Sequence, residues 1–243
     1  MSAGGREGRR GSARGIAIAV RDLRKTFVLH NLGTELEALR DVSLEVRFGE
    51  CLAVDGASGA GKSTLLRCLY GNYLASGGEI VVRGERGEVD LATASPREIL
   101  ELRVRTLSHV SQFLRVIPRV SALDIVAAPM IEQGQDPGAA RGRAGEFLAR
   151  LNIPERLHAL PPMTFSGGER QRVNIARGLA RRARILLLDE PTASLDRHNR
   201  QVAVDLINAA KAEGAAVVGI FHDSEVRDAL ADAVFWLGAP PGR

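Results

Sequence analysis

Apolar residues near the start of the chain alternate with polar ones, as they do in strands with one buried face. Ile16–Val20 and Leu23–Leu29 are predicted to be two short strands, and the alternation continues through Leu36–Val46. These segments predict an antiparallel β lobe. The apolar run Cys51–Val54 predicts a further strand, and Leu65–Tyr70 has the apolar spacing of a helix.

The middle of the chain changes to helical spacing. Ser121–Gln133 and Pro137–Leu151 carry apolar residues at the intervals of a helix face, and a short stretch rich in glycine and proline separates them. We therefore expect an inserted helical lobe at about residues 113–165.

The last third returns to alternating strands and helices. Ile185–Leu188 and Ala215–Phe221 are apolar enough to be strands buried on both faces, with a helix at about 199–212 between them. Strand–helix–strand order implies a parallel sheet with right-handed crossovers. The chain is thus predicted to be one α/β domain over residues 16–243, preceded by a disordered basic tail over residues 1–15.

The composition is that of a globular protein with a substantial core, since 45% of the 243 residues are hydrophobic and 26% are charged. The net charge is only +4 and aromatic residues make up 4%, so we expect no nucleic-acid partner. No run is long enough to span a membrane and the tail lacks an apolar signal segment, so we expect a cytoplasmic protein without direct membrane insertion. Cys51 and Cys68 lack metal-ligand spacing and are predicted to be buried free thiols.

A glycine-rich loop before the first predicted helix carries the clearest chemistry. Its glycines free the backbone so that successive N–H groups can point at an anion, and the helix adds its positive dipole end. Lys62 supplies a compact charge for the β- and γ-phosphates of a nucleotide, and the Ser63 hydroxyl can bind Mg²⁺. Lysine is rare in this chain, with only Lys25 and Lys211 besides, which favours a chemical role for Lys62. The residues of this P-loop are Gly56, Ala57, Ser58, Gly59, Ala60, Gly61, Lys62, Ser63 and Thr64.

Two adjacent carboxylates follow the apolar run Ile185–Leu188. Charged groups at the end of a buried strand are costly unless they serve a cation or a proton. Asp189 is predicted to hold Mg²⁺, directly or through water, and Glu190 is predicted to be the base that polarises the attacking water.

A second helix start is unusual in its first turn, which reads Ser166, Gly167, Gly168 and Glu169. A capping box, with serine at the N-cap and glutamate at N3, is sufficient to begin the helix. It does not explain the two glycines, which weaken a helix but let an anion approach its N–H groups. We therefore expect a second phosphate site, and a head-to-tail pair in which this turn of each chain closes over the γ-phosphate bound by the other.

These motifs resemble those of the ABC-type ATPases, and the resemblance spans residues 16 to 237. The motifs that match in order are the P-loop, Gln112, the turn Ser166–Glu169, Asp189 with Glu190, Ser194–Asp196, and His222. The resemblance implies an ABC-type nucleotide-binding domain with a RecA-like parallel-sheet core. It also implies ATP and Mg²⁺ as cofactors, and a second ABC ATPase chain as partner, either an identical chain or a related subunit.

The resemblance further implies roles for single residues. Gln112 would touch Mg²⁺ and the attacking water, and His222 would bind the γ-phosphate and join Glu190 and Lys62 as a catalytic residue. Phe27 would stack on adenine, although an aromatic residue at such a position is equally well explained by core packing. 

Two residues depart from the family's usual signature. Phe165 stands in place of leucine and Glu169 in place of glutamine. The glutamate adds a negative charge near the γ-phosphate, which Arg170 or Arg172 could screen.

Segments that ABC chemistry does not require resemble the PhnL subunits of the bacterial phosphonate carbon–phosphorus lyase system. They are residues 25–30, 69–74, 111–119 and 218–223. This resemblance implies an ATP-hydrolysing subunit that works with the other carbon–phosphorus lyase subunits and assists formation of ribose 1-phosphonate 5-triphosphate from MgATP and a phosphonate. The alternative interpretation is the ATP-binding subunit of an ABC transporter of the lipoprotein-release or export type.

Overall fold

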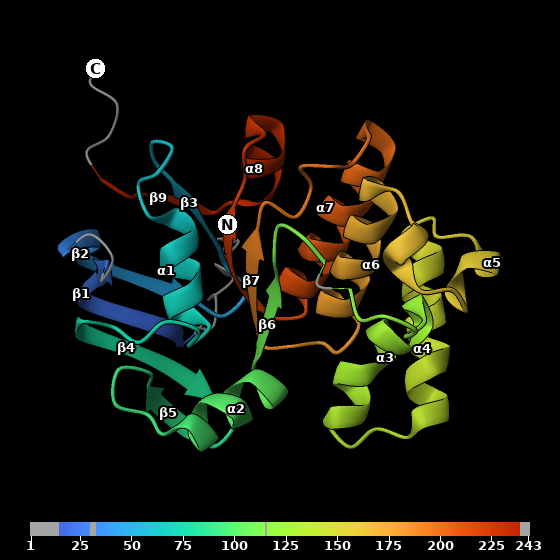
Figure 1. Ribbon diagram of the computed structural model, residues 1–243, viewed down its shortest axis with the longest axis horizontal. Coiled ribbons are helices and arrows are strands. Elements are labelled where there is room, and N and C mark those ends of the chain that lie inside the picture. The colour runs from blue at the N-terminus through green and yellow to red at the C-terminus, as the bar shows by residue number, and fades with distance from the viewer. Residues whose placement is uncertain (1–14, 30–32, 115, 239–243) are drawn as a thin grey trace, which may run out of the picture.

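The computed structural model describes residues 15–29, 33–114 and 116–238. Two sheets and the helices packed around them make up the described part of the chain, with the helices between residues 122 and 212 on the right of Figure 1 and the antiparallel sheet on the left. Nearly all of the predicted basic tail, along with His30 and Arg115 of the PhnL-like segments, lies outside the described residues.

The first sheet is antiparallel, with strand order β2-β1-β4-β5. Its strands are β1 (Ile16–Leu29), β2 (Thr34–Arg47), β4 (Gly77–Gly84) and β5 (Gly87–Asp90). The two short strands predicted at the start are in fact one strand. The pairing of β1 is irregular between Val20 and Leu23, where Asp22 has a φ of 47°, and this local kink explains the break in alternation that suggested two strands.

The second sheet is parallel, with strand order β6-β7-β8-β3-β9. Its strands are β3 (Cys51–Asp55), β6 (Leu107–Val110), β7 (Ile185–Asp189), β8 (Ala216–Ile220) and β9 (Ala233–Trp236). The helices α1 (Lys62–Leu69), α2 (Pro96–Arg105), α7 (Arg197–Ala212) and α8 (Ser224–Leu230) occur in the connections between strands. The predicted α/β class with a parallel core and an antiparallel lobe is confirmed, whereas α8 was not predicted.

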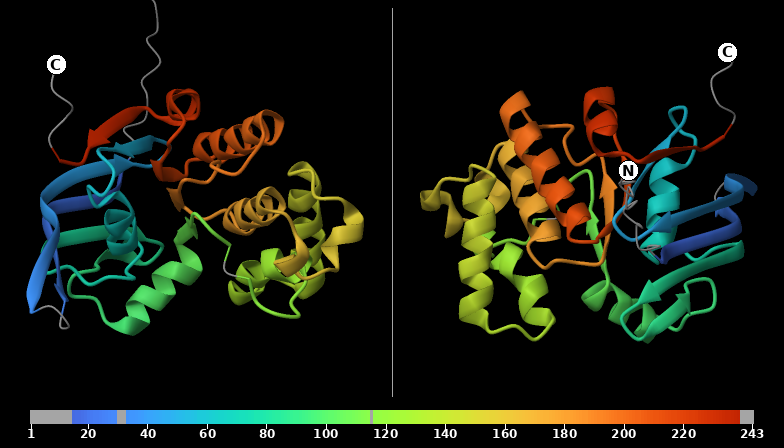
Figure 2. Two further views of the ribbon diagram at one scale, coloured as in Figure 1. Left: turned by 45° about the horizontal axis from the view of Figure 1, so that its top comes forward. Right: turned by 180° about the vertical axis from the view of Figure 1, so that it is seen from behind.

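The helical lobe consists of α3 (Ala122–Glu132), α4 (Pro137–Arg150) and α5 (Glu155–His158), a 3₁₀ turn η1 (Pro162–Thr164), and the adjoining α6 (Gly167–Leu179). Both views in Figure 2 show α3 and α4 on the far side of α6 from the antiparallel sheet. Local capping explains where these helices begin. The side chains of Ser121 and Asp136 accept hydrogen bonds from the first-turn N–H groups of Asp124 and Ala139.

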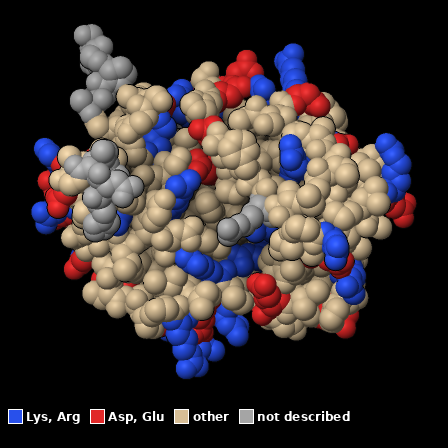
Figure 3. Space-filling model, in the orientation of Figure 1, with Lys and Arg blue, Asp and Glu red and all other residues tan. Residues whose placement is uncertain are grey.

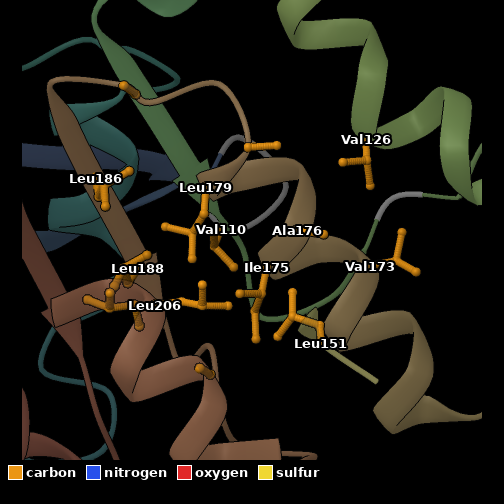
Figure 4. Close-up of a cluster of buried hydrophobic side chains, with 14 of the residues drawn as sticks. Val110, Val126, Leu151, Val173, Ile175, Ala176, Leu179, Leu186, Leu188 and Leu206 are labelled. Atoms are coloured by element: carbon orange, nitrogen blue, oxygen red, sulfur yellow. The ribbon is translucent and has the colours of Figure 1, made fainter. Parts of the chain in front are cut away.

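Strand β7 divides the buried residues into two clusters because its successive side chains point to opposite faces. Leu186 and Leu188 join the cluster that α6 and the helical lobe cover, and Figure 4 shows Leu188 beside Leu206. Ile185 and Leu187 join the cluster between the two sheets. The predicted burial of this strand on both faces is confirmed, and the strand is thereby held rigidly with its carboxyl end at the candidate site.

The two cysteines are free and buried, as predicted. Burial raises the pKa of Cys51 to about 12 and that of Cys68 to about 11, so both remain thiols at neutral pH. Within the described ranges, no helix combines the length and the apolar character needed to cross a bilayer.

Candidate active site

The P-loop connects the end of β3 to the start of α1 and owes its shape to its glycines. Gly56, Gly59 and Gly61 have φ values of 148°, 78° and 95°. A Cβ atom on Gly56 would lie 2.5 Å from the Leu237 carbonyl oxygen, and one on Gly61 would lie 2.3 Å from the Ala38 carbonyl oxygen. Gly56 and Gly61 therefore have to be glycine for two reasons: their φ values, and the close approach of backbone atoms from elsewhere in the fold. The sequence did not reveal the second reason.

The start of α1 has no side-chain cap, because its N-cap residue is Gly61. Its first-turn N–H groups and its dipole therefore face the P-loop rather than a protein side chain. Lys62 reaches back into the same loop, where Nζ donates to the carbonyl oxygens of Gly56 at 2.6 Å and Ala57 at 3.0 Å. A cavity of about 430 Å³ lies over this loop, which is large enough for the phosphates of a nucleotide.

Ser63 and Asp189 meet at the bottom of this site. The Ser63 hydroxyl donates to Asp189 Oδ1 at 3.2 Å, so the first turn of α1 and the end of β7 are brought together as predicted. The pKa of Asp189 is raised, mainly by burial, with the Ser63 hydrogen bond opposing the shift and Glu190 adding to it. A nearby cation would stabilise the charged form of this buried carboxylate.

These two oxygen donors fit Mg²⁺. The described residues contain no group of three or more His, Cys, Asp or Glu side chains able to hold a metal ion. Mg²⁺ does not need one, since it commonly takes one or two protein oxygens together with water and substrate phosphates. Ser63 and Asp189 would hold the ion, with the Gln112 side chain close by at Glu190.

Glu190 lies between two polar side chains that the sequence placed far away from it. Its Oε2 accepts a hydrogen bond from Gln112 Nε2 at 3.0 Å, and its Oε1 lies 2.8 Å from His222 Nε2. Gln112 follows β6, Glu190 follows β7 and His222 follows β8, which are neighbouring parallel strands. The carboxyl ends of parallel strands meet at one edge, so the three predicted residues converge there.

The backbone of Glu190 is held in an uncommon conformation. Its φ is 50°, in the left-handed region, while its N–H donates to the Ile220 carbonyl oxygen at 3.1 Å. Non-glycine residues in this region cost about 1–3 kcal/mol, and such strain clusters at functional sites. The fold uses that conformation to turn the carboxylate toward Gln112 and His222.

The turn Ser166–Glu169 forms the predicted capping box. Ser166 Oγ accepts from the Glu169 N–H at 3.3 Å, and Glu169 Oε2 accepts from the Ser166 N–H at 2.8 Å. The Ser166 hydroxyl also donates to Glu169 Oε2 at 2.8 Å, and the bonds from the Ser166 side chain and then its backbone N–H lower the pKa of the Glu169 carboxyl. A Cβ atom on Gly168 would lie 3.1 Å from the Ser194 carbonyl oxygen, whereas one on Gly167 would meet nothing within 4 Å. Gly168 thus has a packing reason within this chain, and only Gly167 leaves its surroundings open.

The structure does not bring this turn to the P-loop of the same chain, since none of its residues lines the P-loop cavity. Phe27 also lies outside that cavity. Its ring packs edge-on against Tyr73, with centroids 5.1 Å apart, and Lys25 Nζ lies 4.8 Å from its centroid. The stacking of Phe27 on adenine therefore stays a prediction.

Two residues of the site were missed in the sequence. Asp55 ends β3, and its Oδ1 accepts a hydrogen bond from the Gly56 N–H at 2.7 Å. Arg227 of α8 donates to Asp55 Oδ2 at 2.9 Å, and both residues line the P-loop cavity. An acidic residue before the first glycine was visible in the sequence, but its partner is 172 residues away and belongs to the helix that was not predicted.

The comparison with protein families agrees with this geometry. The family model described as "ABC transporter" matches residues 39–193, which run from before the P-loop to just past Glu190. The chain belongs to the ABC transporter family. As an ABC-type ATPase domain it is a P-loop nucleoside triphosphate hydrolase that binds ATP with Mg²⁺.

Curated relatives include ATP-binding proteins of two kinds. The chain is 41% identical to the lipoprotein-releasing system ATP-binding protein LolD of Alcanivorax borkumensis, over 79% of this chain and 82% of LolD. It is 37% identical to the macrolide export ATP-binding/permease protein MacB of Brucella melitensis, over 87% of this chain. The match spans only 32% of that MacB protein.

Solved structures confirm the fold. A dimeric ATP-binding cassette in a post-hydrolysis state, bound to ADP and Pi, superposes with a TM-score of 0.82 and 28% identity. The superposition covers 90% of this chain and 94% of that one. The ABC-type part of the predicted resemblance is therefore confirmed, while none of these relatives is a phosphonate-pathway protein.

Proposed function

We propose that this chain is the ATP-binding and ATP-hydrolysing subunit of an ABC transport machine of the lipoprotein-release or export type. The observation that carries the proposal is the likeness to LolD, which runs over 79% of this chain and 82% of the relative at 41% identity. A second LolD, from Bordetella pertussis, is 42% identical over the same share of this chain. The machine of which this chain forms part would use ATP to move an apolar or lipid-bearing substrate.

In this proposal the chain works as one half of a head-to-tail pair. Ser166 and Gly167 are exposed and lie apart from the P-loop cavity, so they are available to the γ-phosphate bound by a second chain. The similar ATP-binding cassette was solved as a dimer. An identical chain or a related ABC ATPase can fill the second position, because the same two surfaces would be needed from each.

The P-loop part of the site would bind the phosphates of ATP and neutralise their negative charge. Lys62 and the uncapped start of α1 would bind the β- and γ-phosphates, and Ser63 with Asp189 would hold Mg²⁺. The bound ion neutralises charge that develops on the phosphate oxygens.

The other part of the site, around Glu190, would carry out the proton transfer. Glu190 would accept the proton of the attacking water, and its two oxygens are oriented by Gln112 and His222. His222 is 71% exposed on its side chain, so it can also turn to a phosphate oxygen. Gln112 ties this part of the site to the segment that follows β6.

The segment after Gln112 offers a surface for a partner. Phe113 and Ile117 are 73% and 55% exposed, which is costly for large apolar side chains in water. Phe113 directly follows Gln112, whose side chain contacts Glu190, and Ile117 belongs to the same segment, so a partner seated on them would be linked to the state of the site. Figure 3 shows charges of both signs around the rim of the hollow on this side of the molecule.

The phosphonate carbon–phosphorus lyase system is the second candidate, favoured by the PhnL-like segments. Part of segments 25–30 and 69–74 has a packing role in this chain, since Phe27 contacts Tyr73 and Asn72 Oδ1 accepts from Arg103 Nη2 at 2.8 Å. In that case the partner on Phe113 and Ile117 would be another subunit of that system rather than a permease. The expected cytoplasmic location remains a prediction of both candidates.

Affinity purification of the tagged chain from its own organism separates the two candidates. We expect an integral membrane permease to be recovered in detergent, and the variant Phe113→Ser with Ile117→Ser to lose it while still binding ATP. Leu36→Ser is the matched control, because Leu36 is 54% exposed on the distant antiparallel sheet. Recovery of phosphonate-pathway subunits without a permease would refute the transport proposal and support the second candidate.

A further inference from the structure

A second cavity lies at the opposite end of the parallel strands from the P-loop. It has a volume of about 600 Å³ and is lined by residues of α4, the last turns of α6 and α7, and the connections that lead into β7 and β8. The P-loop and Glu190 follow the carboxyl ends of the strands, whereas Arg184 and Ala215 of this cavity precede their amino ends. The right panel of Figure 2, seen from behind, shows α4 and α7, which contribute residues to the wall of this cavity. A volume of this size is typical of a site for a small organic molecule.

The walls of this rear cavity carry an excess of positive charge. Four arginines line it, Arg143, Arg150, Arg182 and Arg184, against two carboxylates, Glu146 and Glu213. Among the described residues that line the cavity, only Arg182 Nε and Glu213 Oε2, at 3.8 Å, come within ion-pair distance of each other. The pKa of Arg143 is lowered, first by burial and next by the charge of Arg182, while the charges of Glu146 and Glu213 oppose the shift.

Aromatic rings hold these arginines against apolar surface. The Arg184 guanidinium lies 4.6 Å from the centroid of the Phe48 ring, and those of Arg143 and Arg150 lie 5.4 Å and 5.5 Å from that of Phe147. Cation–π contacts of this kind limit the motion of the side chains without cancelling their charge. Leucine and alanine side chains of α6 and α7 complete the lining. The rear cavity therefore matches a ligand with an anionic group on an apolar body.

Two helices connect the rear cavity to the proposed pairing surface, by which we mean the turn Ser166–Glu169 and the loop that ends at Asp196. Helix α6 begins directly after Ser166 and runs to Leu179 in the rear cavity. Helix α7 begins at its N-cap Asp196, whose Oδ1 accepts from the Asn199 N–H at 2.8 Å, and ends at the cavity wall near Ala210. A ligand between the far ends of two rigid helices would bias the position of their near ends, and binding and pairing would then affect each other equally.

The geometry points to a binding site for a small organic anion, a phosphate or sulfonate ester or carboxylate with an apolar or aromatic body, that is linked through α6 and α7 to ATP-dependent pairing. This site is separate from the ATP site and does not depend on which machine the chain serves.

Binding is tested with 8-anilinonaphthalene-1-sulfonate, an aromatic anion that fluoresces in apolar surroundings, added to the full chain with its ATP site saturated by MgADP. We expect one bound probe per chain, displaced by phenyl phosphate but by neither phenol nor inorganic phosphate alone. The variant Arg143→Gln with Arg184→Gln should weaken probe binding about tenfold or more, since charge-assisted contacts are lost. Absence of stoichiometric binding, or equal displacement by phenol, would overturn the site.

Two further variants separate loss of the site from loss of the fold. Arg141→Gln is the matched control, because Arg141 lies on the same helix but pairs with Asp124 at 2.9 Å outside the cavity, and it should leave probe binding unchanged. Ala209→Trp fills the cavity from an exposed position and keeps every charge, so it should abolish binding without unfolding the chain. Normal probe binding by Ala209→Trp would place the probe elsewhere and refute the assignment.

The link to pairing is tested in the hydrolysis-deficient Glu190→Gln chain. Probe affinity is measured without nucleotide and with saturating MgATP, and pairing at saturating MgATP is measured by size-exclusion chromatography with and without the same probe. We expect the probe affinity and the pairing constant to change by the same factor, because linkage makes the coupling between one ligand and pairing reciprocal. An unchanged probe affinity in the ATP-bound pair would overturn the link.

Discussion

Replacing Glu190 by glutamine tests the catalytic assignment most directly. The Glu190 side chain is only 14% exposed, and its two oxygens lie at 3.0 Å from Gln112 Nε2 and 2.8 Å from His222 Nε2. Glutamine has nearly the same shape, so it can occupy the same space and still accept the bond from Gln112. It removes the negative charge and the ability to take a proton.

The expected size of the effect follows from that single loss. A positioned general base contributes about 10²–10⁴ in rate, and each factor of ten corresponds to about 1.36 kcal/mol, so the barrier should rise by roughly 3–5 kcal/mol. Lys62, Ser63 and the uncapped start of α1 are untouched, so ATP should bind about as tightly as before. An ATP-bound pair should therefore accumulate.

The assay is phosphate release at saturating MgATP, together with the equilibrium affinity for a fluorescent ATP analogue and the proportion of pairs in size-exclusion chromatography. Glu225→Gln is the matched control, because Glu225 is an exposed glutamate in the first turn of α8 and should leave all three measurements unchanged. Turnover by Glu190→Gln within about threefold of the unmodified chain would refute the general-base assignment.

Two further predictions concern stability. Burial lowers the pKa of His109 from 6.5 to about 4, so the folded chain binds fewer protons than the unfolded chain between these pH values. The free energy of unfolding should therefore fall by an amount on the order of 3 kcal/mol as the pH drops through that window. Thermal melts from pH 7 to 4 should show a smaller loss of stability for His109→Gln than for the control His198→Gln, and equal losses would contradict the burial argument. Gly61→Ala should lower the Tm and abolish ATP binding, because its Cβ would lie 2.3 Å from the Ala38 carbonyl oxygen, whereas Gly59→Ala meets nothing within 4 Å and should cost only the strain of its φ, about 1–2 kcal/mol. Similar melting temperatures for the two glycine variants would show that the loop does not need that close approach.

The chemistry of the site was readable in the sequence because it depends on local patterns. The P-loop, the paired carboxylates after Leu188 and the capping box at Ser166 each occupy consecutive residues, and local chemistry dictates their residue types. The alternation and apolar runs likewise predicted an α/β fold with a parallel sheet. The resemblance to ABC-type ATPases rested on the same motifs, and the family match confirmed it.

The order of the strands in the sheet decided which motif residues come into contact, and no local sequence pattern contains that order. Gln112, Glu190 and His222 meet because β6, β7 and β8 are neighbours in the sheet. The pair of Asp55 and Arg227 joins residues 172 positions apart, so hydrophobic periodicity could not indicate it.

Long-range packing also corrected or added to the sequence-based interpretation. Asp22 adopts a positive φ within one continuous strand, and Gly168 faces the Ser194 carbonyl oxygen rather than only an incoming phosphate. The rear cavity brings together arginines from α4 and from the connection into β7, which the sequence shows only as scattered charges. The sequence by itself determined which groups are available for phosphate chemistry, because those groups act through their immediate neighbours. The tertiary structure decided which of them face one another, because those contacts depend on how strands and helices far apart in the chain pack.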